Sequence, residues 1–127
     1  MTEHARPDIR EVRLVGIPVT DQDQALRFYT ETLGFELQMD VPLPQQRSRW
    51  IVVAPAATAV GIALVAAGVD TPAGVVTGIR FRTPDAAAAH AALEARGVQV
   101  GDVLRWPGVP AMFHVHDLDG NRFELVE

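Results

Sequence analysis

The chain has 127 residues, of which 48% are hydrophobic and 21% are charged, so we expect one soluble domain with its own core. The formal net charge of −5 argues against nucleic acids or acidic membranes as partners, and the lack of cysteine and lysine excludes disulfides, thiolate chemistry and Schiff bases. No apolar run approaches the roughly 20 residues of a membrane helix and no signal-peptide layout is present, so we predict a cytoplasmic protein.

The first half of the chain begins with a predicted strand over Val12–Val19, in which alternate apolar residues share one face. Asp21 has the chemistry of a helix N-cap. Apolar residues at helical spacing follow, and Gly34 marks the end of this predicted helix. The order of signals is therefore strand, cap, helix and stop.

Three further strands are predicted in this half, over residues 35–39, 50–53 and 60–65. Between the first two, Asp40–Arg49 contains Pro42 and Pro44 and is expected to be a loop. It is either an exposed connection, which we favour, or a mobile cover over a pocket.

The second half repeats the order. Ile79, Phe81 and Thr83 alternate as in a strand, Asp85 is placed to cap an alanine-rich helix over residues 86–96, and Gly97 stops it. A strand over residues 98–100 comes next. Each half is expected to be a βαβββ module, with module one over about 9–67 and module two over about 75–127 of a single domain spanning 1–127.

The chain ends in a predicted β-hairpin around Leu118-Asp119-Gly120, with Gly120 in the left-handed region. Counting outward from this turn gives the cross-strand pairs His116–Arg122, His114–Glu124 and Met112–Val126. The opposite face is wholly apolar and is predicted to belong to the core: Phe113, Val115, Phe123 and Leu125. The polar face then carries two imidazoles, a guanidinium and a carboxylate, which suggests the lining of a pocket.

Two segments make the chain resemble a known superfamily. Val15-x-Ile17-x-Val19-x-Asp21, with the helix that follows, and Phe113-x-x-x-Asp117-Leu-Asp119-Gly120-Asn121-Arg-Phe-Glu124 resemble the vicinal oxygen chelate superfamily. It includes glyoxalase I, bleomycin resistance proteins, fosfomycin resistance enzymes and extradiol dioxygenases. The resemblance implies an α+β fold of two βαβββ modules whose curled mixed sheets form a cavity. Relatives often complete that cavity with a second subunit, so we expect a homodimer.

The same resemblance implies where a metal would be held. Metal-dependent members place ligands at positions that here are Leu14, Ala63, Gly78 and Glu124. Only Glu124 is able to bind a metal, and such sites need three or more ligands. We therefore predict no metal and no cofactor.

Candidate chemistry centres on the hairpin pair. His114 and Glu124 are the candidate catalytic residues, as a general base and the group that orients it, or else a structural polar pair. With His116 they also have the composition of a two-histidine, one-carboxylate metal triad. Arg80 is expected to point to the same face, where it pairs with Glu124 or clamps an anionic group of a substrate.

The candidate ligand-binding residues are polar or aromatic: Arg80, Trp50, Trp106, Met112, His116 and Arg122. Trp50 is expected in the core or at the rim of the cavity, and Trp106 either stacks on a flat ligand or anchors a loop. The favoured function is metal-free binding of a small organic molecule, as in sequestration of an antibiotic or metabolite. The alternative is a small-molecule lyase, isomerase or dioxygenase-like enzyme that uses His114 and Glu124 for proton transfer or as metal ligands.

Overall fold

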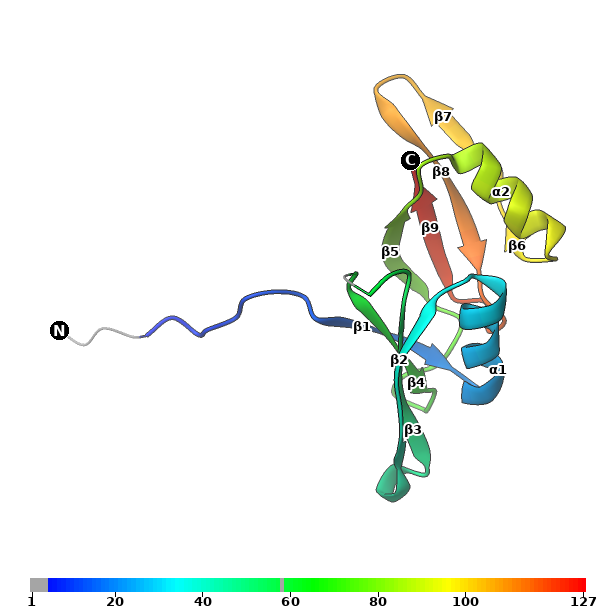
Figure 1. Cartoon of the computed structure of the whole chain (residues 1–127). Helices are drawn as coiled ribbons and strands as arrows, with labels where there is room; N and C mark the ends of the chain where they lie inside the picture. The colour runs from blue at the N-terminus through cyan, green and yellow to red at the C-terminus, as the bar shows by residue number, and fades with distance from the viewer. Residues whose placement is uncertain (1–4, 58) are drawn as a thin grey trace.

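The structure is a computed structural model, which describes residues 5–57 and 59–127. It has an α+β architecture with two separate sheets that do not close into a barrel. In Figure 1 both helices lie on one side of the sheets, and the N-terminal arm projects from the other side. The predicted fold class is confirmed. No helix of the described residues is long and apolar enough to cross a membrane.

The first sheet has the order β1-β4-β3-β2. Its strands are β1 (Leu14–Val19), β2 (Glu36–Leu43), β3 (Ser48–Ala54) and β4 (Gly61–Ala66). Strand β1 runs parallel to β4, while β2, β3 and β4 form antiparallel pairs. The helix between β1 and β2 is α-helical over α1 (Gln22–Arg27) and continues as a π-helical segment, η1 (Phe28–Thr32).

The predicted loop over Asp40–Arg49 is instead a long β-hairpin. Strand β2 continues to Leu43, a single 3₁₀ turn follows as η2 (Pro44–Gln46), and β3 starts at Ser48. Proline predicted a loop because it cannot donate to a ladder, but β2 is an edge strand, where a missing donor is tolerated. The expectation of an irregular loop was therefore wrong at this point.

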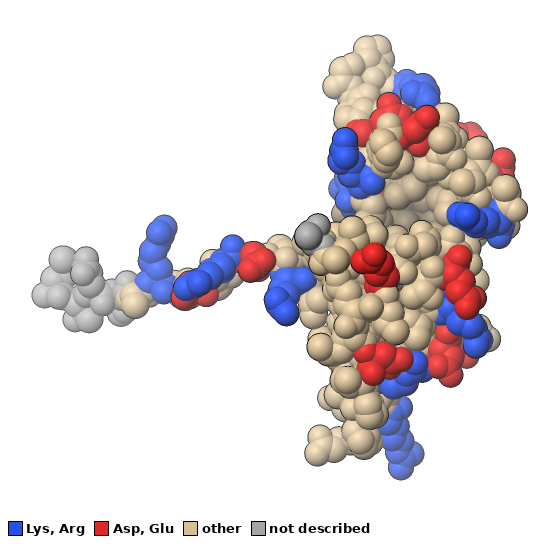
Figure 2. Space-filling view, in the orientation of Figure 1, with Lys and Arg blue, Asp and Glu red and all other residues tan. Residues whose placement is uncertain are grey.

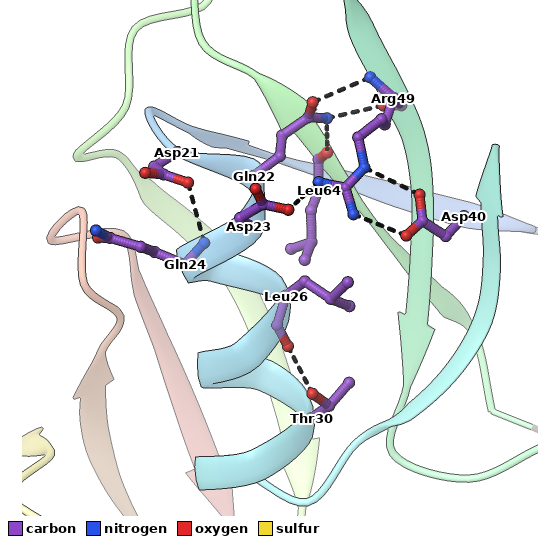
Figure 3. A network of polar contacts seen from close by, with 9 residues as sticks. All are labelled: Asp21, Gln22, Asp23, Gln24, Leu26, Thr30, Asp40, Arg49 and Leu64. Atoms are coloured by element: carbon purple, nitrogen blue, oxygen red, sulfur yellow. Dashed lines mark hydrogen bonds and ion pairs between the residues drawn. The ribbon is translucent and has the colours of Figure 1, made fainter. Parts of the chain in front are cut away.

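The turn end of this hairpin is bound to helix α1 through Arg49, which pairs with Pro42 next to η2 (Figure 3). The Arg49 guanidinium donates to both carboxylate oxygens of Asp40, at 3.1 and 2.7 Å, and pairs with Asp23 of α1. The Gln22 amide donates to the carbonyls of Arg49 and Leu64. The hydrogen bond from Arg49 lowers the pKa of Asp40 below its usual value. The hairpin is thus anchored near its turn.

The second sheet has the order β5-β9-β8-β6, and β7 pairs with β8. Its strands are β5 (Val76–Arg82), β6 (Gln99–Val100), β7 (Leu104–Trp106), β8 (Val109–His116) and β9 (Arg122–Val126), with α2 (Ala86–Ala95) after β5. The short strand β7 is an addition to the predicted pattern. Strands β5 and β9 are parallel, as β1 and β4 are in the first sheet.

Both helices begin as the sequence predicts. The side chain of Asp21 accepts a hydrogen bond from the Gln24 amide, and Asp85 accepts one from the Ala88 amide, each at 3.0 Å. Both caps have extended backbone, as an N-cap requires. Gly34 and Gly97 follow the helical segments with φ of +78° and +77°, a conformation that favours glycine.

The core lies between the helices and the sheets and joins residues of both modules in one cluster. The apolar face of the C-terminal hairpin contributes to it as predicted. Phe113, Val115 and Phe123 are buried, and Leu125 packs against them partly buried. Each sheet therefore has one face covered by a helix and one face without such cover.

A buried polar network connects the last turn to the first module. The Asn121 amide donates to the Pro18 carbonyl at 2.7 Å, and its oxygen accepts from the Gly74 and Val75 amides. The Tyr29 hydroxyl donates to Asp117 at 2.8 Å. Burial, together with the charge of Asp117, raises the pKa of the Tyr29 phenol far above its usual value. This network fixes the position of the hairpin turn relative to β1.

An extended arm over residues 5–13 precedes β1 and projects from the rest of the chain (Figure 1). Basic and acidic side chains are interspersed along it (Figure 2). Ile9 is 85% exposed, and Val12 is also exposed. The arm thus presents apolar side chains that no other described segment covers.

Candidate functional site

The uncovered face of the second sheet carries the polar residues that the sequence singled out. Arg122 pairs with His116, Glu124 with His114, and Val126 with Met112. This is the register predicted from the turn, and Gly120 has the expected positive φ of +78°. Because paired residues of a sheet project to the same face, the polar side chains form a continuous strip. We call Arg80, Arg82, His114, His116, Arg122 and Glu124 the polar strip.

The middle of the polar strip is a three-strand rung. Arg80 on β5 and His114 on β8 both pair with Glu124 on β9. The Arg80 Nε lies 3.1 Å from Glu124 Oε2, with the arginine side chain 61% and the glutamate side chain 18% exposed. The predicted Arg80–Glu124 pair is therefore present. It offsets the negative charge of the partly buried carboxylate.

The predicted base-and-orienter contact between His114 and Glu124 is not formed. The two residues share a rung, but within the described part of the chain the buried His114 Nδ1 and Glu124 Oε2 have no hydrogen-bond partner. The ion pair with Arg80 brings its atoms close without the alignment of a hydrogen bond. The middle rung thus contains two buried polar atoms whose hydrogen-bonding capacity is not used by the described residues.

The third polar pair, His116 and Arg122, lies nearer the turn. His116 Nδ1 is also buried without a hydrogen-bond partner among the described residues. No three histidine, aspartate or glutamate side chains within residues 5–57 and 59–127 gather closely enough to hold a metal ion. The alternative triad of His114, His116 and Glu124 is therefore not assembled in this structure.

The uncovered face of the first sheet has the opposite chemistry. Its middle rung consists of Gly16 on β1, Ala63 on β4 and Val52 on β3. Trp50 lies on the same face of β3 as Val52, 37% exposed, and Met39 of β2 pairs with Val52. Trp50 is thus at a rim rather than in the core. Val52 and Ala63 are themselves buried, so the exposed side chains of Trp50 and Met39 supply the apolar surface of this face.

Two large hollows adjoin these faces. One, of about 630 Å³, lies on the first sheet and is lined by residues that include Leu14, Met39, Trp50, Val52 and Gly61. The other, of about 800 Å³, lies between the modules along the unpaired edge of β5. We call the second the seam hollow. Its walls are mostly apolar: Val12, Val15, Val60, Ile62, Ile79 and Phe81, with Thr77, Arg80 and Arg82 as polar members.

The predicted ligand-binding residues are thus divided among several places. Arg80 lines the seam hollow and Trp50 lines the hollow on the first sheet. Met112, His116 and Arg122 lie on the uncovered face of the second sheet but line neither hollow. Trp106 is on β7, exposed, and lines neither hollow. The structure does not gather the predicted set into one cavity of the single chain.

Sequence reasoning missed most of the seam hollow. Arg82 was not among the predicted ligand-binding residues, yet it lies exposed at the end of β5 and lines the hollow. Ile79 and Phe81 were predicted only as alternating residues of a strand, and they line the hollow too. Both faces of β5 reach the hollow because β5 is an edge strand, and edge position follows from the strand order rather than from local sequence.

Two βαβββ modules with uncovered sheet faces beside a hollow define the glyoxalase and bleomycin resistance fold, which the solved structures below share. The family model of the Glyoxalase/Bleomycin resistance protein/Dioxygenase superfamily matches residues 12–125, so the chain belongs to this superfamily. The predicted resemblance is confirmed.

Individual relatives agree with this assignment. TnmS3, described as an antibiotic binding protein from Streptomyces sp. CB03234, is 36% identical, with a TM-score of 0.85 over 95% of this chain and 98% of that protein. A superfamily member from Sphaerobacter thermophilus DSM 20745 is 34% identical, with a TM-score of 0.83 over 94% and 98%. The uncharacterized protein YetH of Bacillus subtilis (strain 168) is 38% identical over 47 residues, which span 37% of this chain and 38% of that protein.

Proposed function

We propose that this protein binds a small organic molecule without a metal ion and without changing it, as in sequestration of an antibiotic or metabolite. The observation that carries the proposal is the seam hollow, with its mostly apolar walls and two arginines. Its volume of about 800 Å³ lies in the usual range for ligand pockets, roughly 300–1,000 Å³. The cytoplasmic location expected from the sequence remains part of the same proposal.

The residues at the family's metal positions support binding without a metal. Leu14, Ala63 and Gly78 have no side-chain atom that ligates a divalent cation, and the fourth position, Glu124, is paired with Arg80. An arginine beside the only carboxylate supplies the positive charge that a metal would otherwise bring. This set of side chains does not fit a catalytic divalent metal.

The relative TnmS3 supports the class of ligand. Its name describes an antibiotic binding protein, and it matches nearly the whole of this chain in sequence and structure. We extend that description to this chain only as far as a small organic ligand. The two chains need not share the same one, because a shared fold does not fix a ligand.

Native mass spectrometry tests the proposal. The purified protein is analysed as isolated and after incubation with a panel of flat aromatic antibiotics. We expect a one-to-one complex with at least one compound, which denaturation releases at its original mass. Release of a chemically altered compound would contradict simple binding, and no complex with any compound would count against the ligand class.

The second candidate function is proton-transfer catalysis by His114 and Glu124. The observation that favours it is the pair of buried atoms without partners, His114 Nδ1 and Glu124 Oε2, on adjacent strands. If His114 is the catalytic base, a compound bound by the protein is converted to a product of different mass. The variant His114→Gln should then still bind this compound but no longer convert it. Turnover that is unchanged in this variant would reject the residue as the base.

We also propose a homodimer. The apolar face of the first sheet and the arm residues Ile9 and Val12 leave hydrophobic surface exposed, which a second copy of the chain would bury. Sedimentation at tens of micromolar, roughly the range where weak dimers form, should give twice the chain mass. Val41→Asp, on the exposed edge of β2, should shift the mass towards the monomer. A monomer in the unsubstituted protein would contradict the proposal.

A further inference from the structure

The charge around the seam hollow differs in sign from the charge of the whole chain. The chain carries −5, yet the described residues that line the hollow include Arg80 and Arg82 and no aspartate or glutamate. The uncovered face of the second sheet continues this pattern, with Arg122 as a third guanidinium and with Glu124 as the one carboxylate that the described strands place there.

The two arginines of the hollow differ in how their charge is balanced. Arg80 is paired with Glu124 at 3.1 Å, whereas Arg82 has no ion-pair partner among the described residues. Residues two apart on a strand lie roughly 7 Å from each other on one face. Arg82 therefore lies two residues along β5 from the neutralised Arg80–Glu124 ion pair, and its own positive charge is unbalanced.

The surroundings of Arg82 make this charge useful for binding. The side of the hollow formed by Val15, Ile62 and Phe81 is apolar, and the free edge of β5 brings both faces of that strand to the same space. An apolar wall next to a guanidinium reduces the competition from water, and arginine binds carboxylates through two parallel hydrogen bonds.

We propose, on the basis of the proposed binding function, that the ligand is an amphipathic acid. Its flat apolar body lies against Val15, Ile62 and Phe81, and its carboxylate, or an acidic phenol or enol of like charge, binds Arg82. Arg80 positions the ligand indirectly, because its pairing with Glu124 keeps that carboxylate from repelling the acid. The net charge of −5 by itself would favour a neutral or cationic ligand, whereas the positive charge around the hollow favours an acid.

A pair of probes with the same shape and different charge tests this inference. Isothermal titration calorimetry at neutral pH compares 2-naphthoate with 2-naphthamide. We expect the carboxylate to bind at least about tenfold more tightly. Raising the sodium chloride concentration from about 50 to about 500 mM should weaken the binding of 2-naphthoate and leave the affinity for 2-naphthamide unchanged, because only the charged contact is screened.

Three variants locate the contact. Arg82→Gln should remove most of the preference for the acid without changing the affinity for the amide. Arg80→Gln should reduce the preference for the acid, because the negative charge of Glu124 then opposes the contact with Arg82. Arg27→Gln removes an exposed charge on α1, away from the hollow, and should keep the preference of the unsubstituted protein.

Equal affinity for the two probes, or an equal effect of Arg27→Gln and Arg82→Gln, would overturn the inference while leaving small-molecule binding intact. Failure of both probes to bind would also overturn it. The mass-spectrometric experiment with antibiotics decides the proposed function separately, so the two failures are distinguishable.

Discussion

Each module has a rung of three paired residues on three neighbouring strands, at equivalent places in the two sheets. The side chains of the two rungs differ in chemistry. In module one this rung is Gly16, Ala63 and Val52, and in module two it is Arg80, Glu124 and His114. The backbone pairing is the same in both, a parallel pair followed by an antiparallel one. The register is determined by side chains of the opposite, buried face, so the residues of the uncovered face are free to differ.

This difference explains how one fold provides two kinds of surface. The face of module one offers apolar contact near Trp50, and that of module two offers hydrogen bonds and charge.

The largest effect is expected when the glutamate of the module-two rung is introduced at the equivalent position of module one, which is Ala63. Ala63 is only 4% exposed, so Ala63→Glu buries a carboxylate without a partner and should lower the free energy of unfolding by about 3–5 kcal/mol. Urea denaturation measures it. Val65→Glu, on the same strand and face but 37% exposed, should cost about 1 kcal/mol or less.

A second substitution sharpens this test. Gly16 pairs with Ala63, and a side chain at Gly16 meets only an ordinary contact with Val65. Adding Gly16→Arg to Ala63→Glu should therefore recover part of the lost stability. Equal losses for Ala63→Glu and Val65→Glu would contradict the distinction between the two rungs.

The next effect concerns the joint between the modules. Asn121 is fully buried, and Asn121→Ala leaves the Gly74 and Val75 amides and the Pro18 carbonyl without their partner. We expect a loss of about 2–4 kcal/mol in unfolding free energy, measured by denaturation. Leu118→Ala in the same turn, at an exposed residue, is the control and should change little. Similar losses of stability in both variants would contradict the role of Asn121 in holding the two modules together.

A smaller effect on stability distinguishes the roles of His114. Its Nδ1 has no partner in the described chain, so His114→Ala leaves no protein group newly unpaired and should change stability by less than about 1 kcal/mol. If the polar strip binds ligand, the affinity for a compound found by native mass spectrometry should fall several-fold. Unchanged affinity together with a clear drop in melting temperature would show that His114 is only structural.

The smallest effect is the pH dependence of the anchored hairpin in module one. Arg49 lowers the pKa of Asp40, so this pair contributes stability above the ordinary aspartate value of 3.8 and loses it as the pH falls through the lower folded value. The difference in urea midpoint between the protein and Asp40→Asn should therefore be present at neutral pH and vanish below that value. A difference that persists in acid would contradict the assigned cause.

The sequence predicted features that depend on local chemistry. The turn at Leu118-Asp119-Gly120 fixed the hairpin register, because its length and the alternation of Phe113 and Val115 allow only one pairing. The caps at Asp21 and Asp85 followed from their position before the helices. The pairing of Arg80 with Glu124 was one of two roles that the pattern left open.

Other features depend on long-range arrangement and were not predictable. The prolines of Asp40–Arg49 suggested a loop, since nothing local indicates that β2 is an edge strand. The His114–Glu124 register was correct, but whether side chains on one rung form a hydrogen bond depends on their torsions. The seam hollow arises where the edge of β5 meets module one, and no single segment encodes that contact.

The central claim is that the seam hollow between the modules binds a small molecule, with protein charge in place of a metal. Calorimetric titration of 2-naphthoate into protein dialysed against EDTA, repeated with added zinc, manganese, iron or nickel, tests it most directly. The account predicts the same affinity in every titration, with less than one equivalent of metal per chain by elemental analysis. Binding that appears only after a metal is added, with about one metal ion retained per chain, would contradict it.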